Sequence, residues 1–243
     1  MIKEIQEKFI KDLIFNEHHY NNIDILSFID KIDSHLKNNE KNQINMLNFF
    51  RFQSEKEYIR PNYFNVYIFS LLNRSIYNNI KYGILEIYPK TDFISSVIFQ
   101  NSHEYKNLEE LLALNKLIEA DKLTQEILCK LAGKNSQNRQ WLYFTEIKEI
   151  KNKDLKNINL LWNLYSHGKF GFLIQRNIWL NTNKNWKKFW SQIGWINNNK
   201  WTRYPNEFVW NIKNAPAGHL PLFNQIRGTR VIESIFNHEA WLS

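Results

Sequence analysis

The apolar residues of this chain recur at spacings of three and four, and this periodicity restricts the possible folds more than any other feature of the sequence. Its clearest example lies between residues 117 and 131. The repeating positions there are Leu117, Ala120, Leu123, Thr124, Ile127, Leu128 and Leu131. Such a stripe covers one face of an α-helix, and Gly133 stands where a glycine commonly follows a helix end. The pattern predicts a helix that stops near Ala132, within an all-α protein.

The N-terminal region shows the same helical spacing. Apolar residues repeat in this way over 2–14 and 23–36, and a long apolar stretch runs from residue 66 to 85. Pro89 and the polar residues 100–103 then interrupt the pattern. The sequence therefore predicts two domains. Residues 1–103 form an N-terminal helical bundle, and residues 104–243 form a second all-helical domain.

Capping signals predict further helices in the second domain. Asp154 is a suitable N-cap for a helix that Gly168 ends. Another helix carries Trp186 and stops before Gly194. A last one begins at Pro221, because proline is favoured at the first helical position.

Residues 195–214, called the aromatic loop below, lack helical periodicity. Unstructured loops of about 20 residues are uncommon inside compact domains and are commonly functional or disordered. This one carries Trp195, Trp201, Tyr204, Phe208 and Trp210. Because such residues favour burial or binding, we interpret the loop as functional.

Positive charge and tryptophan share one part of the chain. All nine tryptophans follow residue 140, and residues 151–230 carry 13 basic side chains against 2 acidic ones. A surface of this composition attracts anions and stacks flat rings. The ordinary alternative is that the tryptophans are core residues and the lysines a solvated face.

Composition also narrows the class of protein. The single cysteine, Cys129, allows neither a disulfide framework nor a thiolate metal site, and it suits a reducing compartment. No run of about 18 apolar residues is present, so we expect no membrane span. Phosphate-loop, nucleophile-elbow and His-Glu-x-x-His motifs are missing, so we expect neither an enzyme nor a bound metal ion. His219 is expected to hydrogen-bond backbone rather than ligate a metal.

A set of short motifs in a fixed order resembles the Genomes Uncoupled four family over roughly residues 104–241. The motifs are Leu111-Leu112, Ala120-Asp121 with Thr124, Leu161-Trp162 with Tyr165-Ser166 and Gly168, Phe170-Gly171-Phe172 with Gln175, Gly194-Trp195, Trp201 with Tyr204, Ala215-Pro216-Ala217-Gly218-His219-Leu220-Pro221, and Arg227-Gly228-Thr229.

The resemblance implies a function. Members of this family are non-catalytic porphyrin-binding regulators of magnesium chelatase in oxygenic phototrophs, with an all-helical domain shaped like a cupped hand. The version most similar to this chain is the plastid-encoded one of algae. The resemblance thus implies protoporphyrin IX or Mg-protoporphyrin IX as ligand, no obligatory cofactor, the magnesium chelatase large subunit as partner and a place in the chloroplast stroma. A basic face is also compatible with peripheral association with an anionic membrane.

The resemblance places the porphyrin contact on Asn224, Arg227 and the aromatic loop. A porphyrin is a flat apolar ring with two carboxylates along one edge, so it needs an apolar concavity with a basic rim. An arginine can take a carboxylate bidentately, and Arg230 shares a broad helix face with Arg227. The predicted site residues are Trp195, Trp201, Tyr204, Phe208, Asn224, Arg227 and Arg230.

Three alternatives stay open on the sequence alone. The same cup and rim would accept the propionates of haem or of an open-chain bilin. The sequence pI near 9.3 and the alternation of lysine and tryptophan over 184–200 are compatible with nucleic-acid binding, although we expect no nucleic-acid partner because no recognised motif is present. A protein-interaction module that binds no tetrapyrrole is the third.

Overall fold

The computed structural model describes residues 22–56, 63–88, 94, 103–222 and 229–242. Helices dominate these residues, and the strands that they contain form one small hairpin, which confirms the predicted all-α class. The helix expected within residues 2–14 lies outside the described residues. In the described part, no helix combines the length and the apolar character needed to cross a bilayer.

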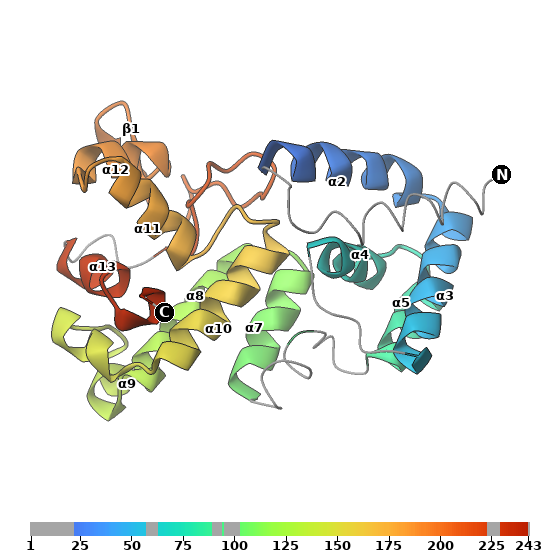
Figure 1. The fold of residues 1–243 in the computed structure, drawn as a ribbon, viewed down its shortest axis with the longest axis horizontal. Coiled ribbons are helices and arrows are strands. Elements are labelled where there is room, and N and C mark those ends of the chain that lie inside the picture. The colour runs from blue at the N-terminus through green and yellow to red at the C-terminus, as the bar shows by residue number, and fades with distance from the viewer. Residues whose placement is uncertain (1–21, 57–62, 89–93, 95–102, 223–228, 243) are drawn as a thin grey trace.

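The N-terminal bundle consists of α2 (Asn22–Leu36), α3 (Glu40–Lys56), α4 (Tyr63–Asn73) and α5 (Asn78–Ile87). These helices form the right-hand half of the molecule in Figure 1. Their core contains Leu47, Phe50, Ile68, Leu72 and Ile80, all buried. Helix α3 was not predicted, because polar residues interrupt its apolar pattern.

The apolar stretch from residue 66 to 85 is two helices separated by a short turn. Ser75 ends the first helix region: its hydroxyl donates to Gln43 Oε1 at 2.6 Å and accepts from the backbone N–H of Tyr77 at 3.1 Å. A serine that binds local backbone in this way offers an alternative to continued helix. The turn also carries Arg74 and the exposed Ile76.

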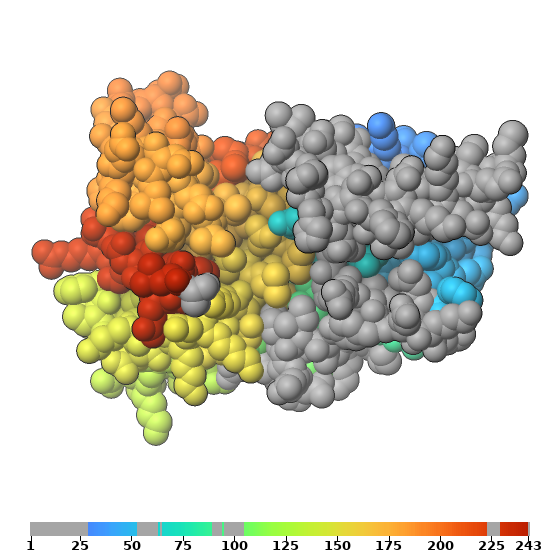
Figure 2. All heavy atoms as spheres, viewed as in Figure 1, coloured from blue at the N-terminus to red at the C-terminus, as the bar shows by residue number. Residues whose placement is uncertain are grey.

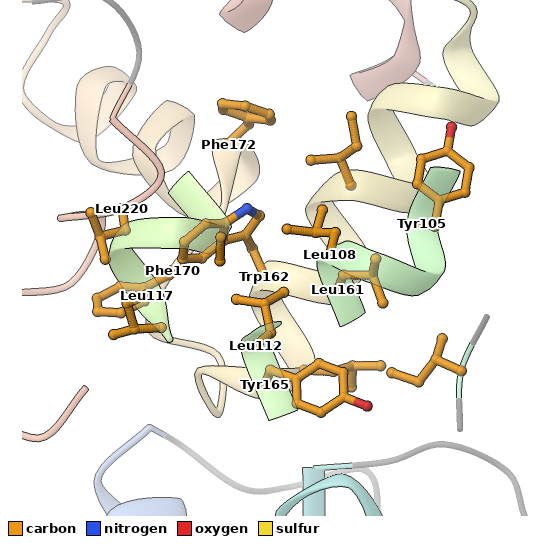
Figure 3. Packing of buried hydrophobic residues seen from close by; sticks show 14 of the residues in the cluster. Tyr105, Leu108, Leu112, Leu117, Leu161, Trp162, Tyr165, Phe170, Phe172 and Leu220 are labelled. Atoms are coloured by element: carbon orange, nitrogen blue, oxygen red, sulfur yellow. The ribbon is translucent and has the colours of Figure 1, made fainter. Parts of the chain in front are cut away.

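The second half is built around α7 (His103–Ala113), α8 (Leu117–Leu131) and α10 (Asn152–Tyr165). Figure 3 shows their buried side chains meeting around Trp162. The indole N–H of Trp162 donates to Thr124 Oγ1 at 2.9 Å, which satisfies the one polar group of that ring. Helix α8 ends at Leu131 with Ala132 as its cap, as predicted.

The predicted N-cap of α10 is wrong. The helix begins at Asn152 with Lys151 before it, so Asp154 lies inside the first turn. A carboxylate is favourable there because of the helix dipole, and it accepts a 2.5 Å hydrogen bond from the hydroxyl of Tyr105. Gly168, with φ of +81°, follows the helix end as expected.

Shorter elements surround this core. They are α9 (Lys134–Arg139), the 3₁₀ helix η1 (Phe144–Glu149), α11 (Phe172–Asn181), α12 (Trp186–Gln192), β1 (Ile196–Asn197), β2 (Lys200–Trp201), α13 (Thr229–Phe236) and the 3₁₀ helix η3 (Glu239–Trp241). In Figure 2, α13 (red) lies between the orange segment of α11 and α12 and the yellow-green segment of α9 and η1.

The last helix differs from the prediction. Pro221 lies in a bend rather than at a helix start, and α13 begins at Thr229. Residues 223–228 lie outside the described residues, so Asn224 and Arg227 cannot be placed. The apolar residues Ile232 and Ile235 of α13 are buried.

The two halves touch through α4, which packs against α7 and α10. The hydroxyl of Tyr63 donates to Asn163 Oδ1 at 2.7 Å, and the rings of Tyr67 and His167 meet edge to face with centroids 5.0 Å apart. The division of the chain at residues 103/104 stays a prediction.

Candidate functional site

The aromatic loop begins with a tight hairpin that the sequence analysis did not predict. Strands β1 and β2 pair with Ile196 opposite Trp201, and the turn between them is Asn198-Asn199. Both asparagines have positive φ, 50° and 60°, which is the backbone of the two-residue turns that match strand twist. After the hairpin, the backbone N–H of Thr202 donates to Trp195 O, just before β1, at 3.1 Å. The hairpin therefore holds Trp201 at a defined position.

A continuous stack of aromatic rings connects α11 and α12 to the loop. Trp186 and Trp190 stack with centroids 5.1 Å apart, and Trp190 stacks on Trp195 at 5.3 Å with only 11° between the ring planes. Trp190 also meets Trp201 at 5.6 Å. Contacts of this kind stabilise a pair beyond the area that it buries. The tryptophans of this region thus form one packed unit rather than separate surface residues.

The predicted site residues of the loop differ in exposure. Trp195 has no exposed surface, and Phe208 is buried with 5% exposed. Tyr204 is partly buried, and Trp201 is 50% exposed. In this conformation Trp195 and Phe208 support the site from within, whereas Trp201 and Tyr204 have surface to offer a ligand.

His219 anchors the loop to the segment that follows it. Its Nδ1 lies 2.7 Å from Ile193 O, and its Nε2 accepts from the backbone N–H of Val209 at 3.1 Å. These partners require a neutral ring with the proton on Nδ1, and burial lowers the pKa of the histidine. Both ring nitrogens are therefore engaged by backbone, as the sequence analysis expected, and neither can ligate a metal in this arrangement.

Asp121 is the site feature that sequence reasoning missed. This buried carboxyl on α8 accepts a 2.6 Å hydrogen bond from the backbone N–H of Leu222, and it is hydrogen-bonded to the hydroxyl of Tyr204. Burial raises its pKa to about 7, although both hydrogen bonds oppose that shift. One acid therefore joins α8, the aromatic loop and the segment before residue 223. Asp121 stood in a quoted motif, but no local signal showed its partners.

Gln175 and Gly218 fix the segment between the loop and residue 222. The Gln175 amide donates to Gly218 O at 2.9 Å and to Pro221 O at 2.8 Å. Gly218 has φ of +75°, and a Cβ there would lie 2.8 Å from Ile178 Cδ1 and 3.0 Å from Ile193 Cγ2. Only glycine fits this combination of backbone and space.

Arg230 lies elsewhere in the site region. It is exposed in the first turn of α13, and its guanidinium stands over the ring of Phe144 with 5.5 Å to the centroid. Phe144 lines a cavity of about 440 Å³ between η1 and the end of α13. The structure thus brings Trp195, Trp201, Tyr204 and Phe208 together through shared ring contacts, and it records no contact of Arg230 with them.

The exposed edge of the aromatic loop is suited to holding a flat ring. Among the described residues, no three His, Cys, Asp or Glu side chains gather where a metal ion could bind. Around the exposed Trp201, the cations Lys200 and Arg203 are also exposed. Such an edge offers stacking surface and positive charge to an aromatic anion.

Comparison with known proteins relates the second half of the chain to one family. A family model described as GUN4-like matches residues 99–239. The chain is 45% identical over 181 residues to the uncharacterized protein Ycf53 of Cyanidium caldarium, covering 74% of this chain and 76% of that protein. It is 32% identical over 142 residues to the protein of Arabidopsis thaliana named tetrapyrrole-binding protein, chloroplastic, covering 55% of this chain and 54% of the relative.

The fold agrees with a solved structure as well. The structure of GUN4 from Chlamydomonas reinhardtii superposes on this chain with a TM-score of 0.54 at 39% identity. The match covers 57% of this chain and 88% of that structure. The residues that the family model matches include the aromatic loop, Asp121 and His219.

Proposed function

The chain belongs to the GUN4-like family, and from this membership we propose that it binds a tetrapyrrole and does not convert it chemically. One observation carries the proposal. The family match spans residues 99–239, which include all seven predicted site residues, and a relative that is 32% identical over 142 residues is named as a tetrapyrrole-binding protein. The ligand that we propose is protoporphyrin IX or its magnesium complex, with no obligatory cofactor.

The proposed binding mode follows from exposure and charge. The ring would stack on the exposed faces of Trp201 and Tyr204, with Trp195 and Phe208 holding those side chains from below. Burying a few hundred Å² of apolar ring at about 25 cal/mol per Å² gives several kcal/mol before the costs of binding. The propionates would be taken by Arg227, with Asn224 and Arg230 as neighbouring donors, since charge-assisted hydrogen bonds orient a carboxylate.

The proposed role is regulatory. A protein that holds substrate or product of magnesium insertion can present it to the enzyme or keep it from photochemistry. We therefore assign to this chain the stimulation of magnesium chelatase, with the large subunit as its partner, in the plastid stroma or on the adjoining membrane surface. The relative in Arabidopsis thaliana supports a plastid protein, because it is named as chloroplastic.

The test of ligand binding is a titration of the purified chain with deuteroporphyrin IX, a soluble protoporphyrin analogue, at low and at high salt. Tryptophan emission and the porphyrin Soret band are recorded together. Saturable quenching with a Soret shift that survives high salt supports the proposal, because buried ring contacts depend little on ionic strength. A folded sample that neither quenches nor shifts the Soret band would contradict it.

The same titration separates the alternatives. Haemin and biliverdin, used as competitors, show whether a closed metal-free ring is preferred. A single-stranded oligonucleotide titrated in parallel tests nucleic-acid binding, whose affinity must fall steeply as salt rises. Stimulation of the chelatase is measured by adding the chain to the assembled enzyme and following magnesium insertion into deuteroporphyrin IX.

A further inference from the structure

A second cavity lies between the N-terminal bundle and the second half, and the end of the aromatic loop, residues 211–213, contributes to its lining. It has a volume of about 600 Å³, within the range of small-molecule sites. Helices α2 and α4, the turns that follow them and Gln43 of α3 form one side. The other side comes from Asn115, His167 and residues 211–213, which belong to three separate turns of the second half.

The charged groups of this cavity leave a cation without a partner. Asp30 forms an ion pair with Lys213, with Oδ1 and Nζ 3.0 Å apart, and Asp33 accepts the hydroxyl proton of Tyr67 in a hydrogen bond. The remaining charged lining residues are Arg74 and Lys37. Three cations thus face two carboxylates, so the cavity carries an excess of one positive charge.

Arg74 is placed to receive a ligand. Its Nε donates to Ser70 O at 3.0 Å, which fixes the direction of the guanidinium. Nothing else among the described residues is hydrogen-bonded to the two terminal nitrogens of Arg74. The side chain is accessible to solvent, yet the surrounding protein desolvates it enough to lower its pKa. An accessible, fixed and partly desolvated guanidinium is a strong donor to a carboxylate.

Two buried polar atoms of lining residues also lack a partner. Neither Nδ1 of His167 nor Oδ1 of Asn115 has a hydrogen bond among the described residues. Burial lowers the pKa of His167 to about 3, with the positive charge of Arg74 adding to that effect, so the ring is neutral at physiological pH. Buried polar atoms in native proteins nearly always have a partner, and Asn115 Oδ1 requires an N–H or O–H donor.

The rest of the lining is apolar. Ile29, Leu71, Ile76 and Ile212 contribute it, and they come from both halves of the molecule. A ligand that matches all of these groups has one negative charge, an apolar body and at least one hydrogen-bond donor.

We propose that this cavity binds a small organic carboxylate with an apolar body and an N–H or O–H group, that the carboxylate is held by Arg74, and that the bound molecule joins the N-terminal bundle to the second half. The site is separate from the proposed tetrapyrrole site, because it shares none of the seven residues assigned there.

Indole-3-carboxylate is a suitable probe, since it has one carboxylate, one N–H and a flat apolar ring. Calorimetric titration of the full chain should show saturable binding with one site. Indole-3-carboxamide, which keeps the shape and lacks the charge, should bind at least about tenfold more weakly, as should the parent probe to Arg74→Met, because each loses a charge-assisted hydrogen bond. Lys81→Met is the matched control, since Lys81 is an exposed residue of α5 outside the cavity lining. Its affinity should equal that of the parent chain.

Two outcomes would overturn the proposal. One is the absence of saturable heat with indole-3-carboxylate in the folded parent chain, and the other is equal affinity in Arg74→Met. If circular dichroism shows that Arg74→Met does not fold, Arg74→Gln, which also removes the charge, replaces it with the same expected loss. Deuteroporphyrin IX titrated into Arg74→Met should bind as it does to the parent. An equal loss of both ligands would place the probe in the tetrapyrrole site and refute the separate cavity site. If the parent binds no porphyrin at all, the probe titration still decides this proposal independently.

Discussion

Asp121 and Leu222 are 101 positions apart in the chain, yet the carboxylate of the first accepts the backbone N–H of the second at 2.6 Å. The same carboxyl holds the hydroxyl of Tyr204. The geometry of two segments of the proposed tetrapyrrole site therefore depends on one buried acid of α8. A buried carboxyl with a pKa of about 7 also makes this connection sensitive to pH near neutrality.

Asp121→Asn should remove a pH dependence of stability. The folded-state pKa of about 7 lies above the ordinary value of 3.8, so the native state binds more protons than the unfolded state between these values. The contribution of this group to the free energy of unfolding of the parent therefore falls by up to about 4 kcal/mol as pH rises from about 4 to 7. Above that range it is constant. Asparagine keeps an oxygen for Leu222 but cannot ionise.

Urea unfolding of Asp121→Asn at pH 4.5 to 8 should show a flatter dependence of stability on pH than the parent. The control is Glu119→Gln, an exposed change on the same helix, which should behave as the parent does. Identical pH profiles for parent and Asp121→Asn would exclude Asp121 as the titrating group.

Arg227→Ala should weaken the binding of porphyrin dicarboxylates with little effect on folding. Loss of one charged hydrogen bond corresponds to roughly tenfold or more in the dissociation constant. Deuteroporphyrin IX titration measures the change, and Lys134→Ala, which removes an exposed positive charge from α9, is the control. Equal affinities of Arg227→Ala and the parent would remove Arg227 from the site.

Replacing Trp201 by alanine should mainly affect porphyrin binding, whereas replacing Trp195 by alanine should mainly affect stability. Trp201→Ala removes a half-exposed ring and should reduce porphyrin quenching at a smaller cost in unfolding free energy than Trp195→Ala. Trp195→Ala empties a fully buried position and should cost about 3–5 kcal/mol of stability. Chemical denaturation and porphyrin titration of both variants test this pair. A large stability loss in Trp201→Ala would show that its ring is structural.

His219→Ala should destabilise the chain without changing the preference between metal-free and magnesium porphyrin. The backbone groups of Val209 and Ile193 lose their partner, which costs about 1–3 kcal/mol for each group left unsatisfied. Because both ring nitrogens already bond to backbone, no axial ligand is lost. The ratio of the affinities for deuteroporphyrin IX and its magnesium complex, measured where the variant is folded, should stay constant. A selective loss of the magnesium complex would instead identify His219 as a ligand to the metal.

Gly218→Ala should be more damaging than Gly133→Ala. Both glycines have positive φ, so each alanine costs about 1–3 kcal/mol in backbone strain. At Gly133 a Cβ meets nothing within 4 Å, whereas at Gly218 it meets Ile178 and Ile193 at 3.0 Å or less. Overpacking adds about 1–3 kcal/mol at Gly218 alone. Thermal unfolding should rank the variants in this order, and equal losses would contradict the close packing around Gly218.

Where a helix buries one face, its sequence was sufficient to predict it. Helix α8 has apolar residues at five of its seven buried positions and a glycine beyond its end, so periodicity and capping agree. Helix α3 escaped prediction because Asn42, Gln43, Asn45 and Asn48 interrupt its stripe, and tertiary packing of Leu47 and Phe50 stabilises it instead. The start of α10 was misplaced because Asp154 satisfies the rule for a cap but is used by Tyr105.

The candidate site could be predicted by residue type but not by exposure. The sequence identified an aromatic loop, yet only the structure shows that Trp195 is fully buried and Trp201 half exposed, although Trp190 contacts both rings. Asp121 could not be assigned a role because its partners lie in two segments distant along the chain. Asn224 and Arg227 stay predictions.

The stacked indoles have an optical consequence. Trp186, Trp190 and Trp195 follow one another with ring centroids 5.1 and 5.3 Å apart, and Trp201 adjoins Trp190 at 5.6 Å. Excitation absorbed by any one of these rings can hop among neighbours that are so close before it is emitted. The four indoles therefore share their excitation energy, which is transferred to an acceptor from whichever ring contacts it. A single porphyrin resting on Trp201 would darken the whole group, and the emission lost on binding would exceed the share of one tryptophan in nine.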